Sequence, residues 1–98
     1  MTKAFNDMHL IAALLSYGFQ PSDIDTTDRT RQRYRFPSDV KKLVWLIDNG
    51  KVVSSEIDVS DVEEAYSTEK LMFLPNYPNV LRRTKYAIIS KKHEDNDD

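Results

Sequence analysis

Arginine occupies every second position between residues 29 and 36, which read Arg-Thr-Arg-Gln-Arg-Tyr-Arg-Phe, and the positions between the arginines become apolar at Tyr34 and Phe36. A period of two is typical of a β-strand with one solvated and one buried face. The segment therefore predicts a strand that directs Tyr34 and Phe36 toward a core. The opposite face of this strand carries four arginines, Arg29, Arg31, Arg33 and Arg35.

Residues 22–25 predict the first arm of an antiparallel hairpin, and the arginine strand is its returning arm. We expect a register with three pairs, Asp25 opposite Arg31, Asp23 opposite Arg33 and Ser22 opposite Tyr34. This register brings opposite charges together on one face. It also offers a purely structural interpretation of the arginines, because exposed cross-strand ion pairs contribute roughly a few tenths of a kcal/mol each.

Apolar residues at intervals of three and four predict helices elsewhere in the chain. Met8, Ile11, Leu14 and Leu15 predict a helix over residues 7–17, capped by Asn6 or Asp7 and closed at Gly18. Further along, a second helix is predicted between a cap at Ser38 and a stop at Asn49-Gly50. Its inner stripe consists of Val40, Leu43, Val44 and Ile47.

Trp45 lies off the stripe of this second helix. Two interpretations follow: the helix is buried on a wide arc, or Trp45 is exposed and available to a partner. We favour packing in the core because tryptophan is usually mostly buried.

The rest of the chain predicts two more helices. Residues 51–59 form either a short edge strand or an extended connection. Ser60 and Glu63 then match a capping box at the start of a third helix. A last helix is expected over residues 78–91, although its end is rich in strand formers, and the acidic tail from residue 92 is expected to be disordered.

The length of 98 residues, with 40% hydrophobic and 31% charged residues, predicts a single domain. The predicted fold is α+β, with three or four helices packed on a small antiparallel β-hairpin. We expect one compact domain over residues 1–91 and a tail over residues 92–98.

The order of these segments resembles a small family of bacteriophage and mobile-element proteins classed as a domain of unknown function. The family shows an apolar LAAxLxxxGF opening, an FxF strand and a short helix ending near NG. The matching segments here cover about residues 8–50, with Tyr34 where the family tends to have phenylalanine and a longer connection over residues 52–78. The resemblance implies a viral or plasmid origin and a role in contacting host or virion proteins. It brings no catalytic residue.

Enzyme signatures are nearly absent from the sequence. Two glycines cannot form a P-loop or a dinucleotide-binding loop, and the two histidines, His9 and His93, lie far apart in the chain. The chain has no cysteine, which excludes thiolate chemistry and disulfides. The carboxylates of residues 56–64 do not follow the calcium-loop spacing. We therefore predict a non-enzymatic protein without cofactor or metal.

Nucleic-acid binding is the first alternative for the arginine face. The net charge of −2 and the isoelectric point of 5.6 argue against it, although the acidic tail hides a slightly positive body. In an extended strand Tyr34 also points away from the arginines, so phosphate contacts and base stacking would lie on opposite faces. Only weak, salt-sensitive binding without sequence preference is then expected.

A protein partner fits the same residues better, because arginine pairs with carboxylates and stacks on apolar groups at interfaces. The partner is a host or phage protein or a second copy of the chain, whose acidic residues 56–64 complement the arginines. Inhibition of a host factor by imitation of nucleic acid, and a role in virion structure or assembly, are further alternatives. The predicted partner-binding residues are Arg29, Arg31, Arg33, Arg35, Tyr77, Arg82, Arg83 and Lys85.

The sequence lacks a secretory signal and an apolar run long enough to span a membrane. A cytoplasmic location, in the host cell if the protein is phage-encoded, is the expectation.

Overall fold

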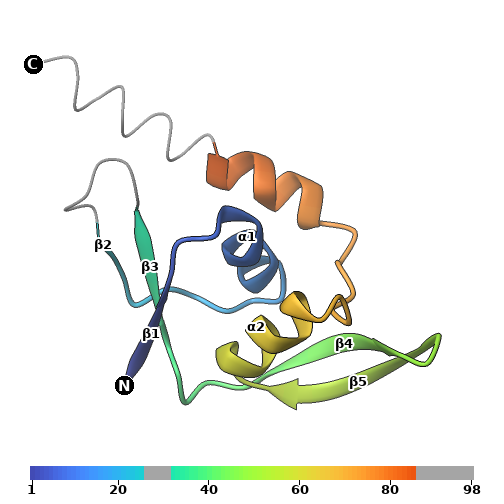
Figure 1. Cartoon of the computed structure of the whole chain (residues 1–98). Helices are drawn as coiled ribbons and strands as arrows, with labels where there is room; N and C mark the ends of the chain where they lie inside the picture. Colours follow the sequence, from blue (N-terminus) through green and yellow to red (C-terminus); the bar gives the residue numbers. More distant parts are fainter. Residues whose placement is uncertain (26–31, 86–98) are drawn as a thin grey trace, which may run out of the picture.

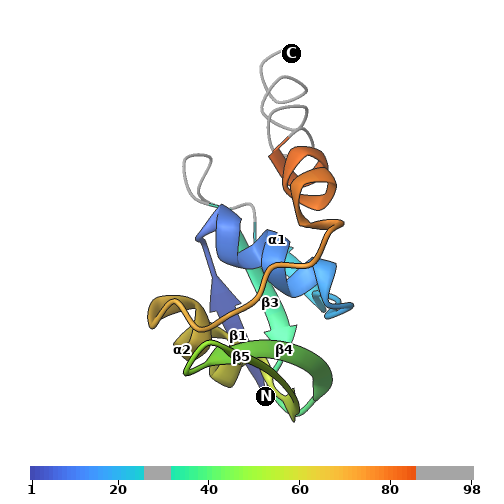
Figure 2. The ribbon, with the colours of Figure 1, turned by 90° about the vertical axis from the view of Figure 1, so that its right-hand side faces the viewer.

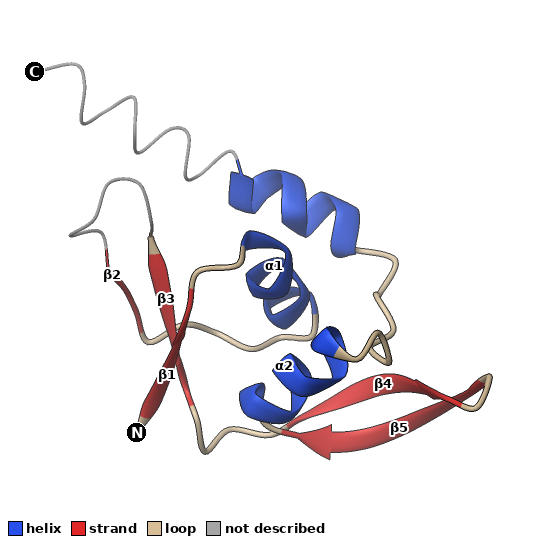
Figure 3. Cartoon of the chain, viewed as in Figure 1, coloured by secondary structure: helices blue, strands red, loops and turns tan. Residues whose placement is uncertain are grey.

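The computed structural model describes residues 1–25 and 32–85 (Figure 1). Its elements follow in the order β1 (Thr2–Phe5), α1 (Met8–Ser16), β2 (Asp23–Asp25), β3 (Arg33–Pro37), β4 (Lys42–Asp48), β5 (Lys51–Ile57) and α2 (Val59–Ser67). A last helix is described over residues 77–85. The α+β class is confirmed, with three helices and two small antiparallel sheets in the described part of the chain (Figure 3).

The first sheet has the strand order β1-β3-β2, so the arginine strand β3 is central. The predicted alternation is confirmed within its described residues, because Tyr34 and Phe36 are buried whereas Arg33 is exposed. The predicted antiparallel pairing with β2 is also confirmed, but the register differs by two residues. Asp23 lies opposite Arg35 and Asp25 opposite Arg33. A shift of two keeps every side chain on its predicted face, so opposite charges still meet.

Helix α1 covers the core side of this sheet (Figure 1). As predicted, Asp7 caps it, since the Asp7 carboxylate accepts hydrogen bonds from the backbone N–H groups of His9 and Leu10. Gly18 follows the helix with φ +96°, the left-handed conformation that closes helices. The segment is a helix because its apolar residues repeat every three or four positions and alanines favour helical backbone.

The second predicted helix is wrong: its residues form β4, which pairs with β5 in an antiparallel hairpin. Asn49 and Gly50 connect the strands with φ of 51° and 77°, the pattern of a two-residue type I′ turn. Because the true period is two, Val44 of the predicted inner stripe is buried whereas Leu43 and Ile47 are exposed. Val40, which precedes the strand, is exposed as well. The edge-strand alternative for residues 51–59 is confirmed by β5.

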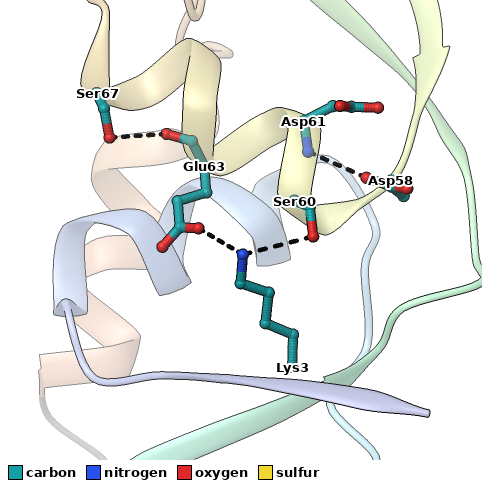
Figure 4. A network of polar contacts seen from close by, with 6 residues as sticks. All are labelled: Lys3, Asp58, Ser60, Asp61, Glu63 and Ser67. Carbon is teal, nitrogen blue, oxygen red and sulfur yellow. Dashed lines mark hydrogen bonds and ion pairs between the residues drawn. The ribbon is translucent and has the colours of Figure 1, made fainter.

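Helix α2 begins two residues before the predicted start, with a different cap. The Asp58 carboxylate, rather than the Ser60 hydroxyl, accepts the hydrogen bond of the Asp61 N–H at 3.0 Å. Glu63 does not reach back to the helix start, because its carboxylate pairs with the Lys3 ammonium of β1 at 2.7 Å (Figure 4). The predicted capping box is therefore replaced by an Asp cap and a link between β1 and α2.

One core joins both sheets and the helices. Its largest fully buried side chains are Phe19, Phe36, Ile11, Leu14, Val44, Val59 and Val62. Phe36 comes from the three-stranded sheet and Val44 from the hairpin, so the two sheets meet through this cluster. Figure 2, turned by 90° from Figure 1, shows α1 between the first sheet and the last helix, with the hairpin below.

The last helix begins near the predicted residue and is described as far as Lys85. Its predicted end at residue 91, the predicted tail over residues 92–98, and the predicted strand positions Arg29 and Arg31 lie outside the described residues. None of the helices in the described ranges is long and apolar enough to cross a membrane.

Candidate protein-interaction surface

The arginine face of β3 is balanced by carboxylates in the described part of the sheet. Arg35 forms ion pairs with Asp23 at 2.9 Å and with Asp25 at 3.2 Å. Arg33 lies opposite Asp25 on the same face. Two arginines and two aspartates leave the described part of this face without net charge, and the ion pairs of Arg35 support a structural role for this residue.

The cationic residues of the last helix belong to another surface. Arg82, Arg83 and Lys85 are all exposed. Arg83 lines a shallow hollow together with Tyr34, whose side chain is on the core side of β3. Because Arg33 and Arg35 point away from that side, the structure does not bring Arg83 and the arginine face together.

Tyr77 lies in an aromatic cluster instead of standing free. Its ring centroid is 4.5 Å from that of Phe73, which also meets Tyr66 at 6.4 Å. Burial raises the pKa of Tyr77 and of Tyr66, and the nearby Asp7 carboxylate raises both further because it disfavours a second negative charge. Tyr77 is half-buried, and Phe73 is the more exposed ring of the cluster.

An exposed apolar surface that the sequence did not predict is one face of the β4–β5 hairpin. Directly opposed residues of an antiparallel pair share a face, and Leu43, Trp45 and Ile47 alternate with the buried Val44. Val52 lies opposite Ile47 and joins the same side. We call this set of Leu43, Trp45, Ile47 and Val52 the hairpin face. Its members are 52%, 39%, 42% and 53% exposed.

The prediction that Trp45 packs in the core is wrong, because Trp45 is the central side chain of this exposed face. Its backbone is nevertheless held firmly. The Trp45 carbonyl accepts hydrogen bonds from the Met72 N–H at 3.0 Å and from the Tyr17 hydroxyl at 3.3 Å. The Ile47 N–H donates to the Lys70 carbonyl at 2.7 Å. These hydrogen bonds therefore hold the backbone of β4 in place beneath the hairpin face.

The two edges of the hairpin differ. Residues 70–72 cover the outer edge of β4 through the bonds just described. In β5 the register and the two-residue turn direct the backbone groups of Val53 and Ser55 toward β4. The N–H and C=O groups of Val52, Ser54 and Glu56 point the other way. In the described ranges no strand pairs with this side of β5, which we call the free edge.

A signal for the hairpin was present in the sequence. Asn-Gly between runs rich in Val, Ile and Trp is the strongest short-range indication of a type I′ hairpin. Its apolar residues also fit helical spacing, so the period alone did not separate the two structures. The exposure of Trp45 follows once the segment is a strand.

Acidic side chains do not converge on a cation site. Asp58 caps α2 and Glu63 pairs with Lys3. Within residues 1–25 and 32–85, no group of three or more His, Asp or Glu side chains is placed to hold a metal ion.

Comparisons of the chain with models of protein families, with curated proteins and with solved structures gave no match.

Proposed function

We propose that this chain is a non-enzymatic accessory protein that acts by protein–protein contact, with the hairpin face as its docking surface. The observation that carries this proposal is the exposure of Leu43, Trp45, Ile47 and Val52 on one side of a supported strand pair. A contiguous apolar patch on a small protein is typical of an interaction site. Tryptophan at its centre is the residue type most often found to dominate binding energy.

The surroundings of the hairpin face fit a protein partner. Ser54 and Glu56 are the polar residues of β5 on the same side, and Lys42, Asp48 and Lys51 lie at the strand ends on the opposite side. The side of the hairpin face is therefore mainly apolar with one carboxylate, and an apolar centre depleted of charge is the ordinary anatomy of a protein interface. A nucleic acid would need a basic surface, and in the described part of the arginine face Arg33 and Arg35 are balanced by Asp23 and Asp25.

The biological setting remains a proposal as well. The accessory role in an infected or plasmid-bearing cell, in the cytoplasm and including inhibition of a host factor, is drawn from the resemblance of residues 8–50 to phage and mobile-element proteins, of which the helix ending near NG is the β4–β5 hairpin here. The hairpin face gives such a protein a means to bind.

A capture experiment tests the docking surface. The immobilised full chain is exposed to bacterial lysate, and retained proteins are compared for the wild type and two double variants. Trp45→Ser with Ile47→Thr removes apolar area from the face, and Arg82→Glu with Arg83→Glu is a matched control at another exposed site. We expect a protein that the wild type and the arginine variant retain and the face variant loses.

The retained protein is then purified and titrated against the chain. Because Trp45 is the only tryptophan, its emission should shift to the blue when the partner covers it. Retention by all three proteins, or loss only with the arginine variant, would overturn the proposed surface. Labelled single-stranded DNA, duplex DNA and RNA, titrated at low and physiological salt, check the nucleic-acid alternative. Strong binding that fails in the arginine variant would favour that alternative.

A further inference from the structure

The free edge of β5 is unusual among exposed strands. It runs over seven residues without a proline, and its pairing with β4 has no bulge. Of the three residues whose backbone groups point outward, only Glu56 is charged. Natural proteins ordinarily protect such edges with prolines, bulges or several charges, because an unprotected edge pairs with another strand.

We propose that β5 pairs with β5 of a second copy of this chain, antiparallel about a two-fold axis at Ser54. The inference rests on the proposed function in so far as both use the hairpin, but it concerns the free edge and not the hairpin face. Only an extended strand satisfies a row of backbone N–H and C=O groups spaced two residues apart. Symmetric pairs are also the commonest assemblies of identical chains.

The side chains of β5 are compatible with antiparallel pairing of β5 with β5 of a second copy. With Ser54 opposite Ser54 of the second copy, Val52 lies opposite Glu56 and Lys51 opposite Ile57, and this register engages all three outward residues. It places no like charges directly opposite each other, which would be destabilising. The hairpin carries two lysines and two acids, so the second copy meets no net repulsion there.

The pairing extends the hairpin to a four-stranded sheet. The two-fold axis is perpendicular to this sheet, so both copies of α2 lie on one side and both hairpin faces lie on the other. Ser54 is opposite Trp45 within each hairpin, so the small serines separate the two tryptophans. The dimer therefore doubles the apolar docking surface without covering it.

Charge exchange at the two-fold axis tests this register. Ser54 is exposed, so Ser54→Lys and Ser54→Glu leave the fold intact. Sedimentation equilibrium of the full chain should show a dimer for the wild type. Each variant alone should dissociate at least about fivefold more readily, because like charges then oppose each other, and mixing the two variants should restore dimers. The same exchange at the exposed Ser67 of α2 is the control and should have no effect.

Amide hydrogen exchange identifies the edge directly. The N–H groups of Val52, Ser54 and Glu56 should exchange fast in dilute protein and slowly in the dimer, whereas those of Val53 and Ser55 should be slow in both. A chain that is monomeric at every concentration would overturn the inference. So would a dimer that is indifferent to the Ser54 variants, or slow exchange at the free edge in a monomer.

The two experiments distinguish a failure of the proposed dimer from a failure of the proposed docking surface. If the Ser54 results are negative while the variant at Trp45 and Ile47 still loses its captured protein, the hairpin face stands and the dimer does not. If the dimer forms as expected and capture is unaffected by the Trp45 and Ile47 variant, the reverse holds.

Discussion

At the scale of single residues, Tyr17 connects α1 to the support of the hairpin. Its single hydroxyl proton is shared between the backbone carbonyls of Met72 and Trp45, and its ring is buried. Tyr17→Phe keeps the ring but leaves both carbonyls without this donor. We expect it to lower the free energy of unfolding by about 1–2 kcal/mol, measured by urea denaturation at neutral pH. An unchanged stability would show that the hydroxyl does not fix β4.

The same substitution alters the pH dependence. Burial raises the pKa of the Tyr17 phenol above its ordinary value of 10.0. As pH rises past that value the unfolded chain loses the proton while the folded chain keeps it, so stability falls until the folded pKa is passed. Tyr17→Phe should therefore lose stability less steeply above this pH. The remaining decline comes from Tyr34, Tyr66 and Tyr77, whose pKa values are also raised by burial.

Gly50 tests the turn between β4 and β5. A Cβ at this position would meet no atom within 4 Å, so only the backbone conformation opposes a side chain. Because φ is +77°, Gly50→Ala should cost about 1 kcal/mol in urea denaturation. Asn49→Gly is the control, since glycine accepts the positive φ of residue 49 without that cost. Equal stability of wild type and Gly50→Ala would contradict the type I′ turn.

At the scale of elements, neighbouring residues of β4 should respond very differently to truncation. Val44 is completely buried, and Val44→Ala should cost about 2 kcal/mol through lost contacts and a cavity. Leu43→Ala should cost clearly less than this, because Leu43 faces away from the core and is 52% exposed. Both are measured by thermal denaturation followed by circular dichroism. A larger loss at Leu43 than at Val44 would mean that the strand has the opposite face inward.

The elements that the sequence predicted well are those with one unambiguous period. α1 has helical spacing together with alanines, and β3 has strict alternation, so in both cases local preference and burial agree. The segment over β4 fits two periods at once, and the choice depends on Asn49-Gly50, which serves equally as a helix stop and as a hairpin turn. Tertiary contacts decide it: residues 70–72 add backbone hydrogen bonds that only a strand can accept.

The candidate surface was less predictable for the same reason. The charge of the arginines favoured them as binding residues. Asp23 and Asp25 balance the described part of their face, and this pairing depends on the strand register. The hairpin face became visible only when Trp45 was placed on a strand. Distant pairs such as Lys3 with Glu63 carry no local signal in the sequence.

At the scale of the whole molecule, the shared core predicts one cooperative unfolding transition. Phe36 and Val44 belong to different sheets and to the same cluster, so neither sheet keeps its core when the other opens. Emission of Trp45 reports on the hairpin, and far-ultraviolet circular dichroism reports mainly on the helices. Their urea transitions should coincide. Separate midpoints would show that the hairpin unfolds independently of the helices.

The accessibility of Trp45 is the most direct test of the claim that the hairpin presents an open apolar face. Acrylamide quenching of the only tryptophan is measured in the dilute folded protein and in the urea-unfolded chain as a reference. Since 39% of Trp45 is exposed, we predict ready quenching of the folded protein at a substantial fraction of the unfolded value, with emission at intermediate wavelength. Emission typical of a buried indole, with almost no quenching, would show that the hairpin face is covered.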